Sequence, residues 1–137
     1  MNVRWLLDTN AASTTINKKS AAMDRHLRKV PMAELGLSAV TEAELRYGAA
    51  RSGSAPLQNT VEQFLLAVTI FPWDSEAARE YGELRAALEH AGQDQFLKRG
   101  SLDMMIAAHA LALGVILITN DQAFSRIKRL KVEDWTK

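Results

Sequence analysis

The sequence predicts an α/β protein built on a parallel sheet that helices cover on both faces. Two observations lead to this prediction. Helical periodicity alternates along the chain with short apolar segments, and these segments lack the polar alternation of half-exposed strands. With 137 residues and 47% hydrophobic content, the chain can bury a substantial core. We therefore expect a single domain over residues 1–137.

The first predicted strand carries the most informative residues. Residues 3–7 form a short apolar run that stops at Asp8-Thr9-Asn10, which is turn chemistry. In an open α/β sheet, ligands bind at the carboxyl ends of the strands. Asp8 is therefore expected to anchor a divalent-metal site. The next segment, residues 11–19, fits either a short helix or a loop.

The rest of the chain alternates between helical and strand patterns. Further strands are expected over residues 35–40, 68–71, 115–119 and 131–133. Helices are expected over residues 21–30, 42–51, 57–67, 75–91 and 102–113, with a short helix near Phe124. Thr41, directly after the second expected strand, is the predicted N-cap of helix 42–51, with Glu44 at the capping-box spacing. Ser101 is the predicted cap of the buried helix. Residues 92–100 have the polar composition of a loop.

The composition excludes several classes of protein. Charged residues make up 24% of the chain and leave a net charge of +1, which argues against a strongly basic nucleic-acid binder. The absence of cysteine excludes disulfides, thiolate zinc sites and cysteine nucleophiles. No secretory pattern starts the chain, and no apolar run approaches the ~18 residues of a membrane helix. We expect a cytoplasmic protein with no membrane association.

Four acids lie where a parallel sheet could bring them together. Asp8 and Asp121 each follow an apolar run, so they are expected on the same rim of the sheet. Glu44 lies about one turn into the helix after the second strand. Asp103 lies in the first turn of the buried helix and reaches the rim only if that helix begins there.

Such a cluster requires a cation. Two carboxylates ~4 Å apart repel each other by roughly 4 kcal/mol at an effective dielectric near 20. Mg²⁺ or Mn²⁺ removes this repulsion, prefers oxygen ligands and can activate a bound water for attack on a phosphodiester. Thr9, Ser38 and Asn120 are candidate hydrogen-bond donors around the acids.

Each acid also has a purely structural explanation. Asp8 and Asp121 could serve turns, Glu44 could be the capping-box partner of Thr41, and Asp103 could interact with the helix dipole.

Three neighbouring residues are open to more than one interpretation. Glu42 lies two positions before Glu44, although residues at this spacing do not share a helix face. His109 fits a packed histidine better than a catalytic base, and Ser38 could equally be a small core residue. Basic side chains near three of the acids could hold phosphates, namely Arg46 with Arg51, Lys98 with Arg99, and the basic residues of segment 126–131.

Four segments together resemble the signature blocks of PIN-domain ribonucleases. In order they read LLDTN (6–10), SAVTEAELRYGA (38–49), GSLDMMIAAHA (100–110) and LITNDQAF (117–124). With the ending VEDW (132–135), they are most similar to the VapC toxins of bacterial type II toxin–antitoxin pairs. The resemblance spans nearly the whole chain, and its four blocks follow the family's order.

The resemblance implies both a fold and an activity. It implies a three-layer α/β/α sandwich with a central parallel sheet and Mg²⁺- or Mn²⁺-dependent endoribonuclease activity. Catalytic and metal-binding roles would fall on Asp8, Glu44 (rather than Glu42), Asp103 and Asp121. The expected partners are an RNA substrate, such as a tRNA or another structured RNA cut at a single-stranded loop, a VapB-type antitoxin and a second copy in a homodimer. Segment 93–99 is longer and more charged than the family's usual link, which leaves the local loop and the substrate open.

Two other functions remain open at the level of the sequence. The same acids could serve a non-toxin PIN nuclease acting on DNA or flap substrates. A non-catalytic nucleic-acid-binding module with a decayed site is the second alternative, although the four intact acids argue against it. A phosphotransferase or receiver-like domain would want a lysine near the end of the last central strand, where this chain has Asn120-Asp121.

Overall fold

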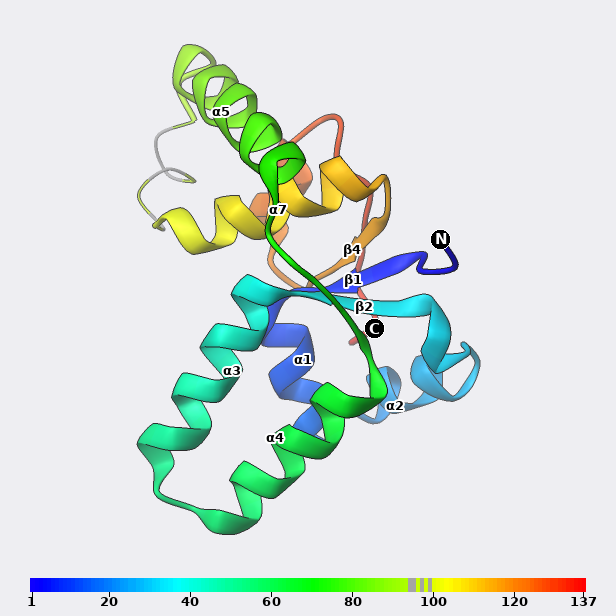
Figure 1. Ribbon diagram of the computed structural model, residues 1–137. Helices are drawn as coiled ribbons and strands as arrows, with labels where there is room; N and C mark the ends of the chain where they lie inside the picture. The colour runs from blue at the N-terminus through cyan, green and yellow to red at the C-terminus, as the bar shows by residue number, and fades with distance from the viewer. Residues whose placement is uncertain (94–95, 97, 99) are drawn as a thin grey trace.

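A parallel sheet lies at the centre of the protein, as the sequence predicts (Figure 1). The computed structural model describes residues 1–93, 96, 98 and 100–137. Within these residues the sheet has five strands in the order β3-β2-β1-β4-β5. The strands are β1 (Trp5–Leu7), β2 (Leu35–Ser38), β3 (Thr69–Phe71), β4 (Ile116–Ile118) and β5 (Val132–Glu133), and all pair in parallel.

The chain order explains why helices cover both faces of the sheet. From β1 the chain moves outward to β2 and β3, and it then returns to β4 on the other side of β1. Because right-handed crossovers place helices on opposite faces when this direction reverses, the helices divide into two layers (Figure 1). One layer holds α1 (Thr9–Ile16), α2 (Ala21–Arg28), α3 (Ala39–Ser52) and α4 (Ala55–Ala67), and the other holds α5 (Ser75–His90) and α7 (Ser101–Leu113).

Alternate residues of the central strands belong to two separate hydrophobic cores, one on each face of the sheet. Leu6 and Leu117 pack with the buried residues of α5 and α7. Leu7 and Ile118, the next residue in each strand, pack with the first four helices. All four side chains are fully buried, which is why neither strand shows polar alternation in the sequence. The predicted three-layer α/β/α sandwich is therefore confirmed.

Two predicted helix caps are wrong. β2 ends at Ser38, two residues before the predicted end, and the Ser38 hydroxyl accepts a hydrogen bond from the Val40 amide at 3.1 Å as the N-cap of α3. Thr41 is a buried residue inside the first turn, so it does not cap the helix. Gly100 is the N-cap of α7, with a φ of 101°, and Ser101 is the first helical residue.

The remaining segments follow the predicted pattern with small shifts. The ambiguous segment 11–19 is mostly helical, because α1 begins at Thr9 and ends at Ile16. The short helix near Phe124 is a 3₁₀ helix, η2 (Gln122–Arg126), and a second one, η1 (Met32–Glu34), precedes β2.

The structure describes only part of the predicted loop over residues 92–100. Residues 94–95, 97 and 99 lie outside the described residues, so the expectation about segment 93–99 is not addressed there. Within that segment Phe96 is buried, and its ring meets the ring of Phe124 edge-on at 5.5 Å between centroids. Across the described part of the chain, no helix is both long and apolar enough to span a bilayer.

Candidate active site

An acid pocket lies at the carboxyl ends of β1 and β4. This is the point where the strand order reverses, which is where open α/β sheets bind ligands. The pocket has a volume of about 500 Å³. It is lined by three acids, Asp8, Asp103 and Asp121, together with Thr9, Asn10 and Asn120. Three of the four predicted acids are therefore brought together, although they come from three distant parts of the chain.

Asp8 has both a structural and an electrostatic role in this pocket. Its Oδ1 accepts a hydrogen bond from the Ala11 amide at 2.7 Å, so the side chain caps α1. The residue is only 4% exposed. Burial, together with the smaller effect of the Asp103 and Asp121 charges, raises the pKa of Asp8 to about 6, against the opposing hydrogen bonds from Thr119 and Ala11. The structural explanation of Asp8 and the metal-site prediction are thus compatible.

Asp103 and Asp121 reach the pocket from the other helical layer and from the end of β4. Asp103 lies in the first turn of α7, and this helix begins on the same side of the molecule as the carboxyl ends of the strands (Figure 1). Asp121 caps η2, because its Oδ1 accepts a hydrogen bond from the Ala123 amide at 3.0 Å. Both carboxylates are close enough to Asp8 to raise its pKa.

Glu44 does not line the acid pocket, but it is connected to the pocket by Thr9. The Thr9 hydroxyl donates a hydrogen bond to Glu44 Oε1 at 2.6 Å. Thr9 directly follows Asp8 and lines the acid pocket itself. The prediction that Thr9 orients an acid is consistent with this contact, and Glu44 lies beside the three aspartates instead of among them.

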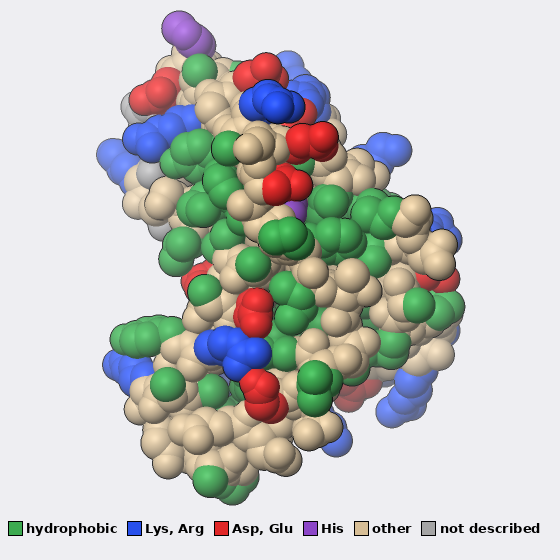
Figure 2. Space-filling view, in the orientation of Figure 1, with side chains coloured by type: hydrophobic (Ala, Val, Ile, Leu, Met, Phe, Trp, Pro, Cys, Tyr) green, Lys and Arg blue, Asp and Glu red, His purple; other side chains and the backbone are tan. Residues whose placement is uncertain are grey.

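A second hollow adjoins the acid pocket on the side of Glu44. It has a volume of about 730 Å³, and Thr9 and Glu44 belong to its wall. The rest of the wall is mainly apolar and includes Val40, Ala43, Tyr47, Trp73, Leu102 and Met105. We call it the apolar hollow. Figure 2 shows the molecule notched on its left side, with hydrophobic side chains above and below the notch and an acidic side chain at its back.

Sequence reasoning missed Thr119 as a contributor to the site. The Thr119 side chain is buried and hydrogen-bonded to the Asp8 carboxylate, which lowers the pKa of Asp8 against the effect of burial. Its hydroxyl also accepts a hydrogen bond from the Asp121 amide at 3.0 Å. Thr119 therefore couples the ends of β1 and β4. Thr119 ends an apolar strand run, as Asp8 does, and this position could have indicated from the sequence that it contributes to the site.

Asn120 contributes to the site through a residue that the sequence did not single out. Asn10 donates a side-chain hydrogen bond to Asn120 Oδ1 at 2.8 Å, across the mouth of the pocket. This bond joins α1 to the segment after β4. Ser13, one turn further along α1, completes that side of the pocket and was also not predicted.

Ser38 and His109 form a buried contact between the two acid-bearing helices. His109 Nδ1 lies 2.8 Å from Ser38 Oγ, and His109 is 1% exposed. Burial lowers the pKa of His109, with a smaller opposing effect from Asp74. The prediction of a packed histidine is confirmed. Ser38 contacts the start of α3 and His109, so it supports the helices that carry Glu44 and Asp103.

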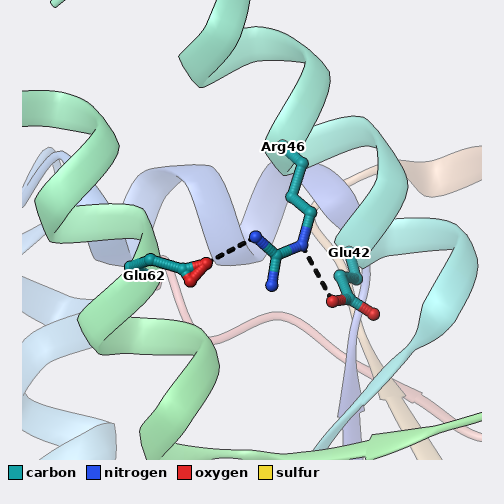
Figure 3. A network of polar contacts seen from close by, with 3 residues as sticks. All are labelled: Glu42, Arg46 and Glu62. Carbon is teal, nitrogen blue, oxygen red and sulfur yellow. Dashed lines mark hydrogen bonds and ion pairs between the residues drawn. The ribbon is translucent and has the colours of Figure 1, made fainter. Parts of the chain in front are cut away.

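Two of the basic side chains considered for phosphate binding are already paired with acids. Arg46 lies between Glu42 on its own helix and Glu62 on α4, with Nε donating to Glu42 at 2.9 Å (Figure 3). These two acids raise the pKa of Arg46. Arg129 donates to both carboxylate oxygens of Glu80 at 3.0 and 3.1 Å. The contacts also separate Glu42, which faces Arg46, from Glu44, which faces Thr9.

The donor atoms of the acid pocket suit a hard divalent cation, since they are carboxylate, hydroxyl and amide oxygens. Among the residues that the structure describes, no three His, Cys, Asp or Glu side chains are close enough to hold one ion together. Mg²⁺ usually keeps several waters and takes one or two protein carboxylates directly, so a closed cage of ligands is not required. The pKa of Asp8 is raised mainly by burial and to a smaller extent by the charges of Asp103 and Asp121, and a cation bound beside these carboxylates would favour its charged form.

Comparison with known proteins identifies the class to which this fold and pocket belong. The PIN-domain family model matches residues 5–130, a range that contains all four predicted acids, so the chain belongs to the PIN-domain family. Within that family the chain is 34% identical to the tRNA(fMet)-specific endonuclease VapC of Shigella flexneri, over 98% of this chain and 99% of that protein. It is 33% identical to Ribonuclease VapC2 of Rickettsia felis, over 97% of this chain and 98% of that protein. These relatives place it among the VapC ribonucleases.

A solved structure supports the same assignment. The crystal structure of VapBC2 from Rickettsia felis, bound to a DNA fragment from the promoter, contains a chain that superposes with a TM-score of 0.86 at 32% identity. The match covers 97% of this chain and 99% of that chain. The expected resemblance to VapC-type PIN domains is thereby confirmed.

Proposed function

We propose that the protein is a divalent-metal-dependent endoribonuclease that cleaves a tRNA or another structured RNA at a single-stranded loop. The observation that carries this proposal is the acid pocket, where Asp8, Asp103 and Asp121 meet at the strand-order reversal of a PIN domain. The related Shigella flexneri protein is specific for tRNA(fMet), which supports tRNA as the class of substrate.

The residues of the pocket have separate proposed roles. Asp8, Asp103 and Asp121 would hold Mg²⁺ or Mn²⁺, one or two of them directly and the rest through water, with Glu44 as the fourth acid beside them. When bound, the cation would neutralise these carboxylates and polarise a phosphodiester and a water. Thr9 would orient Glu44 through the hydrogen bond at 2.6 Å. Asn120 would hold the mouth of the pocket in place together with Asn10. The carboxylate, hydroxyl and amide oxygens that line the pocket support this cofactor, because hard divalent cations prefer oxygen ligands.

The proposed partners follow from the relatives. VapC proteins are found in VapBC complexes, as in the Rickettsia felis structure. We therefore propose that a small VapB-type antitoxin neutralises this protein. The homodimer implied by the resemblance to VapC toxins is the proposed active form. Because tRNA and a newly made antitoxin are both cytoplasmic, the cytoplasm is the proposed site of action.

The first test replaces Asp8 by Asn and follows cleavage of labelled RNA with Mg²⁺ or Mn²⁺. Asn keeps the cap of α1 but removes the charge, so cleavage should fall by more than the roughly 10- to 100-fold typical of losing a residue that only supports a metal ligand. Asp74→Asn is the matched control, because Asp74 caps α5 in the same way at 3.0 Å and lies outside the acid pocket. Full activity of Asp8→Asn would contradict the proposal.

A second comparison tests Glu44 against its neighbour. Glu44→Gln should reduce cleavage strongly, whereas Glu42→Gln should leave it close to wild type, because Glu42 faces Arg46 on the surface. Equal losses in the two variants would remove Glu44 from the proposed site.

Parallel assays with DNA oligonucleotides address the main alternative, since a DNA or flap nuclease would cleave DNA with the same acids. Cleavage of DNA in preference to RNA would favour that alternative.

A further inference from the structure

We infer that the apolar hollow binds an unpaired nucleobase next to the phosphodiester that is cleaved at the acid pocket, with Tyr47 as the stacking surface. This inference rests on the proposed ribonuclease function and deepens it, because it names the part of the substrate that the neighbouring hollow recognises.

The first support is the position of the hollow. Thr9 lines both the apolar hollow and the acid pocket, and its hydroxyl bonds to Glu44 on the shared wall. A nucleotide carries its base and its phosphate on the same sugar. A phosphate held over the acid pocket therefore brings an adjacent base to the mouth of the apolar hollow.

The second support is the exposed aromatic side chain on the wall. Tyr47 is 66% exposed, although it is one of the largest apolar side chains of α3. It lies three residues after Glu44, so both side chains project from the same face of the helix. Leu102, on the first turn of α7, is also exposed on this wall at 47%. Exposed apolar side chains that gather in one hollow beside a catalytic pocket indicate a binding surface.

Trp73 gives the hollow a fixed aromatic side chain in addition to Tyr47. Its Nε1 donates a hydrogen bond to the Met105 carbonyl at 3.0 Å, and its ring meets Tyr81 edge-on at 6.0 Å. The indole is therefore held in place by α7 and α5. A flat ligand would find one fixed and one exposed aromatic ring in the same hollow.

The charges on the wall of the apolar hollow determine which part of a nucleotide can enter it. Among the described residues that line the two cavities there is no Lys or Arg, and the charged residue on the wall of the apolar hollow is Glu44. Arg46, the nearest basic residue along α3, is paired with Glu42 and Glu62. A phosphate would be repelled by Glu44, whereas an uncharged base can stack on an aromatic ring. The base must be unpaired, because bases within a duplex are already stacked.

The experiment measures RNA binding by full-length Asp8→Asn protein, which keeps the RNA intact. A short single-stranded RNA that the wild type cleaves is labelled, and an abasic nucleotide is placed at each position in turn. We expect one abasic position near the cleavage site to weaken binding about 5- to 150-fold, the range for the loss of one stacked base. Tyr47→Ala, added to Asp8→Asn, should weaken binding of the intact RNA by a similar factor.

The decisive observation is whether the abasic substitution in the RNA and Tyr47→Ala in the protein weaken binding independently of each other. If Tyr47 stacks on that base, the abasic RNA should bind the Tyr47→Ala protein no more weakly than the intact RNA does. Tyr47→Phe keeps the ring and should bind within about threefold of the parent protein. Leu66→Ala is the control, because Leu66 is 78% exposed on α4 and lies outside both cavities.

Three outcomes would overturn the inference. Tyr47→Ala could bind intact RNA as tightly as its parent, or the abasic and Tyr47→Ala losses could multiply. Tyr47→Ala could also keep RNA binding and lose binding to the antitoxin, which would assign the hollow to the protein partner. If the wild type cleaves no RNA with Mg²⁺ or Mn²⁺, the proposed function fails as well, and this result is distinct from cleavage that does not depend on Tyr47.

Discussion

At the scale of single residues, Asp8 combines two demands that normally conflict. It caps α1 through Ala11, which stabilises the fold, and it is buried beside two other carboxylates, which opposes its ionisation. An isolated capping aspartate would be exposed, with a lowered pKa. The raised pKa of Asp8 is therefore consistent with its proposed role as a metal-binding carboxylate, because perturbed pKa values are typical of functional sites.

This conflict predicts a pH dependence of stability in EDTA. The pKa of Asp8 is about 6 in the folded protein, against 3.8 for the ordinary side chain, so the folded state binds the proton more tightly. Protonated Asp8 therefore stabilises the folded protein below pH 4, and this contribution is lost as the pH rises through 6. At pH 7, Asp8→Asn should therefore be more stable than the wild type by on the order of 2 to 3 kcal/mol. Asp8→Ala should gain about 1 kcal/mol less, because it loses the cap.

Urea denaturation at pH 4, 5 and 7 measures these differences. The advantage of Asp8→Asn should shrink towards pH 4, where the wild-type carboxyl is protonated in both states. An Asp8→Asn protein that is less stable than wild type at pH 7 in EDTA would contradict the assigned pKa.

At the scale of secondary structure elements, the close packing of β2 depends on a glycine. A Cβ on Gly36 would lie 2.8 Å from Phe71 Cε2 and 3.0 Å from Val3 Cγ1. Gly36→Ala should therefore displace the Phe71 ring on β3 and destabilise the protein by about 1 to 3 kcal/mol. Gly82→Ala is the matched control: nothing lies within 4 Å of its Cβ in α5, so it should stabilise by about 0.5 to 1 kcal/mol. Chemical denaturation of the two variants compares them, and equal effects would show that β2 tolerates a side chain.

At the scale of the whole molecule, the fold holds the acids in place through contacts between its two helical layers. His109 of α7 reaches Ser38 at the start of α3, so the helix that carries Asp103 is tied to the helix that carries Glu44. Both faces of the same sheet are covered, and β5 continues it beside β4. We propose that residues 1–137 act as one domain for this reason.

The proposed toxin function makes a prediction for the whole protein in cells. Expression of the wild-type chain should arrest bacterial growth, because cleavage of a tRNA would stop translation. Expression of Asp8→Asn should not arrest growth, and co-expression of a VapB-type protein encoded beside the gene should restore growth to cells with the wild type. Growth curves measure all three cases. Arrest by Asp8→Asn equal to that of the wild type would separate toxicity from the acid pocket.

Local features of the sequence were sufficient to predict the parallel sheet and the acids that follow β1 and β4. An apolar run that stops at an acid identified Asp8 and Asp121, because the end of a buried strand is marked by its own residues. The predicted cap at Thr41 was wrong for an equally local reason. Ser38 ends β2 and caps α3 at once, with no loop between them, so the capping-box spacing of Thr41 and Glu44 had no structural counterpart.

The sequence by itself determined that this chain forms a parallel sheet with acids at its strand ends, since burial and turn chemistry act over a few residues. Only the tertiary structure decided which acids share a pocket. The arrival of Asp103, the link from Thr119 to Asp8 and the pairing of Arg46 with Glu62 all join residues distant in the sequence. Such contacts depend on strand order and on the side of the sheet to which each helix returns, and no local pattern encodes the distance between two side chains.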